Sequence, residues 1–193
     1  MQNHGGPTRL LDWSDGSLMA LHFALRDKKD DSWNARAYVL ESYRLSEKLK
    51  SLPDIRLFEQ QWKAYVAKHP SYDLDEDDWE DGYLPADEDD NTELPMPPPS
   101  VVLDFPHITR RIAAQRSRFI VFGTDPACLS EEFKRADSTI KVIEIAAEKR
   151  PTIRQELRDC GVTESVIYPD LDGLGREMRQ LWDARRAAAE ENS

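Results

Sequence analysis

The segment His4-Gly5-Gly6-Pro7-Thr8-Arg9-Leu10-Leu11-Asp12-Trp13-Ser14 places two glycines, a proline and several polar side chains directly before an apolar run over residues 18–25. The two glycines permit positive φ angles and a close approach of another group to the backbone. The proline fixes its own φ and pushes the residue before it out of the α region. We therefore predict a shaped loop before Thr8.

The apolar run predicts a helix that is capped by Ser14 or Asp15. Its apolar side chains would cover most of the helix circumference, which is typical of a helix buried on several sides. They are Leu18, Met19, Leu21, Phe23 and Leu25. A polar loop anchored to a buried helix is a suitable support for a binding or catalytic site.

Three blocks of this sequence resemble the FRG domain, a bacterial and phage-associated module named after a Phe-Arg-Gly motif. The second block is Arg111-Ile112-Ala113-Ala114-Gln115 with Phe119 after it, and the third is Tyr168-Pro169-Asp170-Leu171-Asp172-Gly173-Leu174. The first block is the string that ends in Trp13, with Ser14 in place of the usual threonine, together with the apolar run that follows it and ends in Phe23-Ala24. Its matching residues are His4, Gly6, Pro7, Thr8, Arg9, Leu10, Leu11, Asp12, Trp13, Ala20, Phe23 and Ala24.

The resemblance covers nearly the whole chain except residues 44–100, and it has two implications. The Phe-Arg-Gly motif itself is expected upstream of His4, so the resemblance implies a domain that is truncated at its N-terminus. It also implies a setting in bacterial stress or phage defence.

The expected fold class is α/β, of the α+β type, with a mixed or mainly antiparallel sheet flanked by helices. A length of 193 residues is sufficient for one domain with its own core. We expect a single FRG-like domain over residues 1–185 and a tail over residues 186–193. Residues 71–100 are predicted to form an acidic and proline-rich loop within that domain.

Periodicity predicts the main elements. We expect a final helix from Leu171 to Trp182 whose apolar side chains Leu174, Met178 and Leu181 point inward together with Trp182, and a fraying chain beyond Ala184. The other predicted helices cover residues 45–50, 58–69 and 151–160, the last with proline at its start and glycine after its end. Strands are predicted at residues 35–40, 119–122, 140–145 and 166–168.

The net charge of −11 comes from one segment of the chain. Residues 73–90 contain 11 acidic and no basic residues, so the remaining 26 acidic residues equal the 26 basic ones. A partnership with nucleic acid through net positive charge is therefore unsupported. Because Trp79, Tyr83 and Leu84 lie among the acids, the acidic loop either docks on a protein partner or basic groove or is a solvated charged loop.

The two cysteines, Cys128 and Cys160, are far apart, and no Cys or His spacing typical of a metal site occurs. We therefore expect reduced thiols and no metal. No run of about 18 apolar residues and no secretory start is present. The sequence predicts a cytoplasmic protein without a membrane partner.

The candidate catalytic residues are His4, Thr8, Arg9 and Asp12. His4 would act as donor, base or ribose contact, or would be a packed surface histidine. Thr8 would bind a ligand or brace the turn. Arg9 would pair with Asp12, contact a phosphate-bearing ligand, or be solvated.

The candidate ligand-binding residues are Gly6, Trp13, Arg111 and Gln115. The basic cluster around Arg111 would either grip phosphates or neutralise the acidic loop. Two further polar groups have simpler interpretations. His22 is predicted to be a satisfied core or edge histidine, and Asp170 or Asp172 to be a helix cap.

The FRG resemblance and a more distant likeness to the nucleotide pocket of ADP-ribosyltransferases imply a nucleotide-binding enzyme or effector. Such an enzyme would transfer ADP-ribose or process NAD, with NAD as its candidate cofactor. His4 and Thr8 would orient the ribose, Arg9 would hold a phosphate, and an acid such as Asp12 or Glu144 would stabilise the cationic sugar. The alternatives are a non-catalytic ligand- or partner-binding module and a structural or regulatory domain.

Overall fold

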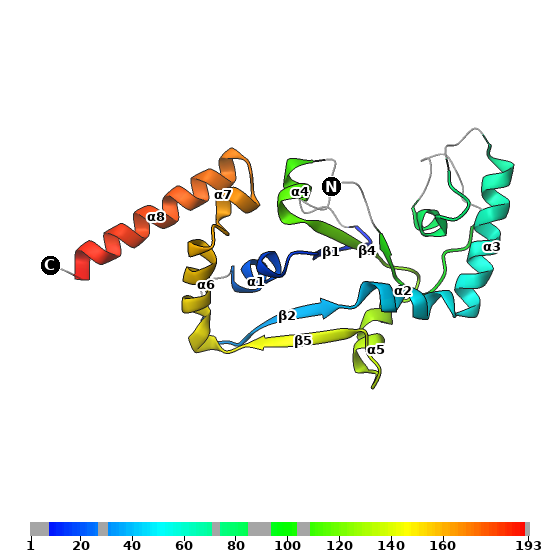
Figure 1. Cartoon of the computed structure of the whole chain (residues 1–193), viewed down its shortest axis with the longest axis horizontal. Helices are drawn as coiled ribbons and strands as arrows, with labels where there is room; N and C mark the ends of the chain where they lie inside the picture. The colour runs from blue at the N-terminus through cyan, green and yellow to red at the C-terminus, as the bar shows by residue number, and fades with distance from the viewer. Residues whose placement is uncertain (1–7, 27–30, 71–73, 85–93, 104–108, 192–193) are drawn as a thin grey trace. The chain divides into compact units, whose positions relative to one another are not determined.

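The computed structural model describes residues 8–26, 31–70, 74–84, 94–103 and 109–191 (Figure 1). The predicted α+β class is confirmed, with the strands divided between two small antiparallel sheets. In the three-stranded sheet, β4 (Ser117–Val121) lies between β1 (Leu10–Ser14) and β3 (Val101–Leu103). The register of β3 and β4 places Val102 opposite Ile120. The two-stranded sheet pairs β2 (Ala35–Leu40) with β5 (Ile140–Ile145).

The chain forms two compact units. Unit 1 comprises Met1–Asp12, Tyr38–Phe105 and Arg118–Lys141, and unit 2 comprises Trp13–Ala37, Pro106–Ser117 and Val142–Ser193. Each unit has its own apolar cluster.

Unit 1 is built on α2 (Ser42–Lys50), α3 (Pro53–Lys68) and the short 3-10 helix η2 (Trp79–Tyr83); it also contains α5 (Cys128–Lys134). Pro53 lies in the first turn of α3, where the missing N–H costs nothing. The buried face of α3 has the spacing of an amphipathic helix. It consists of Ile55, Phe58, Trp62 and Tyr65.

Two aromatic side chains of the acidic segment belong to the core of unit 1, which corrects the interpretation of a fully solvated loop, whereas docking on a protein partner stays a prediction. Trp79 and Tyr83 are buried and pack edge-on against Phe58. The hydroxyl of Tyr83 donates to the carbonyl of Pro99 at 3.0 Å. A Cβ atom at Gly82 would lie 2.9 Å from the rings of Phe58 and Trp62, so this close packing requires glycine.

Unit 2 contains α1 (Ser17–Leu25), α4 (Arg110–Gln115), η3 (Ala147–Lys149), α6 (Arg150–Asp159), α7 (Glu164–Ile167) and α8 (Leu171–Glu191). In Figure 1, α1 lies beside α6, and α7 leads directly into α8. Its apolar cluster has Leu25, Leu157 and Ile167 at its centre.

Several local predictions are wrong. Gly16 is the N-cap residue of α1, in place of Ser14 or Asp15, and it makes no side-chain cap bond. Of the apolar side chains of α1, Leu25 is fully buried whereas Leu18 and Phe23 are exposed. The predicted strand at residues 166–168 belongs to α7 and the turn after it, because residues 164–167 form a helical turn.

The last helix also differs from its prediction. It continues to Glu191, so the chain beyond Ala184 is helical as far as it is described. The side chains predicted to point inward are exposed, with Met178 at 59% and Trp182 at 70% of their full exposure. The apolar face of α8 is real, but most of it lies on the surface.

Candidate functional site

The end of the first sequence block is joined to the second block within unit 2. The hydroxyl of Ser14 donates to the backbone carbonyl of Gln115 at 2.8 Å and accepts the N–H of Gly16 at 3.2 Å. The N–H of Asp15 donates to the carbonyl of Arg116 at 3.1 Å, and the Arg116 side chain pairs with the Asp15 carboxylate at 2.8 Å. The start of α1 is therefore fixed to the end of α4.

Helix α4 presents Arg111 and Gln115 from a well-capped turn. Thr109 is its N-cap, and the Thr109 hydroxyl accepts the N–H of Ile112 at 3.1 Å. Arg116 ends the helix with a φ of 50°, in the left-handed region. Gln115 is 7% exposed. The short helix thus has defined ends despite its six residues.

The ring of Tyr168, from the third block, lies among three arginine side chains. The guanidinium carbons are 5.0 Å (Arg26), 4.8 Å (Arg111) and 4.5 Å (Arg176) from the ring centroid. Tyr168 is 3% exposed. These distances fit cation–π interactions, which stabilise each cation by roughly 0.5–1 kcal/mol at exposed sites and more when desolvated. We call these four residues the arginine–tyrosine cluster.

The charge of Arg176 is compensated, whereas the charges of Arg26 and Arg111 are not. The Nε atom of Arg176 donates to the carboxylate of Glu164 at 3.0 Å. Within the described part of the chain, neither Arg26 nor Arg111 forms an ion pair with a carboxylate, and the buried Nε of Arg111 has no hydrogen-bond partner. Buried N–H groups are almost always paired in proteins, so this cluster is well prepared to receive an anion.

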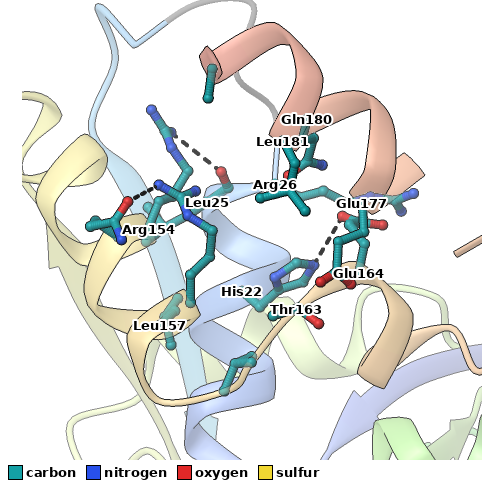
Figure 2. Close-up of a pocket in the computed structure, with 14 residues that line it drawn as sticks. His22, Leu25, Arg26, Arg154, Leu157, Thr163, Glu164, Glu177, Gln180 and Leu181 are labelled. Atoms are coloured by element: carbon teal, nitrogen blue, oxygen red, sulfur yellow. Dashed lines mark hydrogen bonds and ion pairs between the residues drawn. The ribbon is translucent and has the colours of Figure 1, made fainter. Parts of the chain in front are cut away.

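Next to the cluster lies a cavity of about 480 Å³, which Arg26 also lines (Figure 2). Its walls come from α1, α6, the start of α7 and α8. Figure 2 shows His22 directed toward Glu164, and their closest side-chain atoms are 3.4 Å apart. This contact lacks hydrogen-bond geometry, so the description of His22 as a satisfied histidine stays a prediction. The apolar part of the lining is Leu25, Leu157, Val162 and Leu181.

Two carboxylates line this cavity, and they differ in their partners. Glu164 is 6% exposed, pairs with Arg176 and lies 3.4 Å from His22. Glu177 accepts the N–H of Ser165 at 2.9 Å. A hydrogen bond from the Ser165 side chain, together with that backbone N–H, holds the pKa of Glu177 below its ordinary value. Glu177 is therefore an ionised acceptor in the cavity wall.

The structure places the predicted catalytic residues as follows. His4 lies outside the described residues. The Thr8 hydroxyl accepts the N–H of Leu10 at 3.4 Å, the geometry of the bracing alternative. Arg9 donates to the carbonyls of Tyr83 at 2.9 Å and Phe122 at 3.3 Å. Asp12 is an exposed residue of β1.

The predicted ligand-binding residues are divided in the same way. Gly6 lies outside the described residues. Trp13 is half-buried, and its buried Nε1 atom has no hydrogen-bond partner among the described residues. Arg111 and Gln115 belong to unit 2, whereas Thr8, Arg9 and Asp12 belong to unit 1. The groove predicted between the two blocks stays a prediction.

The residues that sequence reasoning missed are Arg26, Glu164, Arg176 and Glu177. The third block could have pointed to this part of the structure, because it contains Tyr168, the ring at the centre of the arginine–tyrosine cluster. The predicted cap in that block is confirmed, since the Asp170 side chain accepts the N–H of Gly173 at 2.7 Å. A Cβ at Gly173 would lie 2.0 Å from the Tyr168 carbonyl oxygen, so glycine allows α8 to start close to the cluster.

Comparisons with known proteins support the resemblance over part of the chain. The family model of the FRG domain matches residues 1–32, which confirms the predicted resemblance for the first block. No curated protein and no solved structure matches the chain.

Three further findings concern the described residues. They contain no group of three or more His, Cys, Asp or Glu side chains arranged to hold a metal ion. No helix formed by these described residues is both long and apolar enough to cross a membrane. Cys128 and Cys160 are both unbridged, as predicted.

Proposed function

We propose that this protein is a nucleotide-binding module in which Arg26 and Arg111 hold a phosphate group. The observation that carries the proposal is the pair of uncompensated arginines on one buried tyrosine ring, next to a cavity that Arg26 lines. Guanidinium groups bind phosphate oxygens through short, charge-assisted hydrogen bonds. Contact with the Tyr168 ring holds both groups beside one side chain before a ligand arrives.

The cavity supports a ligand larger than phosphate alone. A volume of about 480 Å³ lies within the range of roughly 300–1,000 Å³ that is typical of small-molecule pockets. Its apolar lining suits a flat base, and its carboxylates suit hydroxyl or amino groups of the ligand. A nucleotide combines all three chemical features.

The test is a titration of the protein with ADP, ATP, AMP, NAD and inorganic phosphate, followed by calorimetry. We expect at least one nucleotide to bind more tightly than phosphate. Arg26→Ala and Arg111→Ala should each lower its affinity about tenfold or more, because each removes a hydrogen bond to a charged group. Arg179→Ala is the matched control, since Arg179 is exposed on α8 and belongs neither to the cluster nor to the cavity lining. A wild-type protein that binds none of these ligands would refute the proposal.

A second candidate function is the predicted processing of NAD or transfer of ADP-ribose. The observation that favours it is the presence of Glu164 and Glu177 in the cavity wall. In hydrolysis, the bond between the ribose C1′ and nicotinamide breaks, nicotinamide leaves with the electron pair, and the oxygen of water bonds to C1′ as its proton is lost to solvent. A carboxylate stabilises the positive charge that develops on the sugar.

Release of nicotinamide from NAD distinguishes the two functions. Turnover by the wild-type protein at saturating NAD that is lost in Glu177→Gln would favour the enzyme over the binding module. Binding without release would favour the module. Our proposal retains the predicted cytoplasmic location and the stress or phage-defence setting as predictions.

A further inference from the structure

Glu177 carries an inference that rests on the proposed function and makes its ligand more specific. The side chain is half-buried in the cavity wall and is fixed by the N–H of Ser165 at 2.9 Å. Among the described residues, no lysine, arginine or histidine forms an ion pair with it. A carboxylate has about four acceptor positions, so the N–H of Ser165 and the hydroxyls of Ser165 and Thr163 leave room for one further donor.

Glu177 is opposite in charge to Arg26 and Arg111, in a cavity whose lining also contains Arg154 and Arg158. Arg26 and Arg111 attract phosphate oxygens, which only accept hydrogen bonds, whereas Glu177 accepts hydrogen bonds and would repel phosphate. The ligand group beside Glu177 must therefore be a donor without negative charge. In a nucleotide, the ribose diol offers two such donors close to the phosphate.

We infer that Glu177 binds the 2′-hydroxyl of a ribose, so that the cavity selects ribonucleotides over deoxyribonucleotides. An acidic side chain that accepts hydrogen bonds from a ribose diol is a recognised way of reading this sugar. Glu164 is less suited to this role, because Arg176 and His22 already face its two oxygens.

The experiment compares the affinities of ADP and 2′-deoxy-ADP for the wild-type protein and for Glu177→Gln. Glutamine retains an oxygen that can accept the N–H of Ser165, so the helix contact is preserved while the charge is removed. Asp183→Asn is the matched control, because Asp183 is an exposed carboxylate on the same helix outside the cavity lining. Far-UV circular dichroism checks that each variant is folded.

We expect the wild-type protein to bind ADP about tenfold more tightly than 2′-deoxy-ADP, since a hydrogen bond to a charged group is lost. Glu177→Gln should bring the two affinities to within about a factor of two of each other, mainly by lowering the affinity for ADP. Asp183→Asn should retain the wild-type ratio.

Two results would overturn the inference, and they differ in whether the proposed function survives. Equal affinities of the wild-type protein for ADP and 2′-deoxy-ADP, or an unchanged ratio in Glu177→Gln, would remove ribose selection while phosphate binding by Arg26 and Arg111 stands. The absence of any nucleotide binding would overturn the proposed function and this inference together.

Discussion

Replacing Tyr168 by leucine separates the two contributions that the ring makes to unit 2. Leucine fills most of the buried volume, and such an exchange of one apolar side chain for another usually costs less than about 1.5 kcal/mol. Leucine has no π-face, so contacts with Arg26, Arg111 and Arg176 are also lost. At roughly 0.5–1 kcal/mol for each cation, these contacts together contribute about 1.5–3 kcal/mol.

The expected loss of unfolding free energy for Tyr168→Leu is therefore about 2–4 kcal/mol, measured by urea denaturation and far-UV circular dichroism. Hydrogen exchange of peptides from α7 and α8 shows whether unit 2 is the part that loses protection. Tyr168→Phe is the control, because phenylalanine retains the ring and should cost less than about 0.5 kcal/mol. If Tyr168→Leu costs no more than about 1 kcal/mol, the account of three stabilising cation–π contacts on Tyr168 is refuted.

Four further substitutions test the packing and the charges. Gly173→Ala should destabilise the protein by about 2 kcal/mol or more, because the added Cβ would lie 2.0 Å from the Tyr168 carbonyl oxygen. Gly175→Ala should be stabilising, because a Cβ at Gly175 has no atom within 4 Å. Thermal denaturation that ranks the two variants in the opposite order would contradict this expectation. Gly82→Ala should cost about 1–3 kcal/mol in unit 1, since the new Cβ would lie 2.9 Å from Phe58 and Trp62; an unchanged melting temperature would show that the two rings can move apart. The hydrogen bond from Arg154 holds the pKa of Asp31 below its ordinary value of 3.8, so Asp31 stabilises the folded state at neutral pH, and this stabilisation is lost as the pH falls through and below that value. Asp31→Asn should therefore destabilise the protein at about pH 7 and lose its effect in acid, and a destabilisation that does not change with pH would contradict the sign of this shift.

The sequence predicted those elements whose signals are local. Alternation marked β2 with the bounds that the structure shows, Ala35–Leu40. Proline at the start and glycine after the end marked α6, where Gly161 has a φ of 81°. Residues 166–168 misled, because three apolar residues in a row fit a strand and a helical turn equally well.

Packing against distant parts of the chain is what periodicity could not show. The pattern of α8 correctly indicated an apolar face, but Met178 and Trp182 are exposed. Helical periodicity reports that one face is apolar, and it carries no information about which element covers that face. The same limit explains why α1 has Phe23 on the surface.

The candidate site was predictable only in its parts. Arg111 and Tyr168 were both noted in separate blocks, but their contact at 4.8 Å joins positions far apart in the sequence. Arg26 lay outside every block, and Arg176 looked like an ordinary surface residue of an amphipathic helix. Arg9 was expected to contact a phosphate-bearing ligand, to pair with Asp12 or to be solvated, and in the structure its guanidinium donates to two backbone carbonyls.

The most direct test of the central claim is a crystal structure of the protein with bound ADP. The account predicts phosphate oxygens at about 2.7–2.9 Å from guanidinium nitrogens of both Arg26 and Arg111, with the nucleoside in the adjoining cavity. The account would be contradicted if ADP were bound elsewhere, for example with its phosphates on Arg9, while the arginine–tyrosine cluster held no anion.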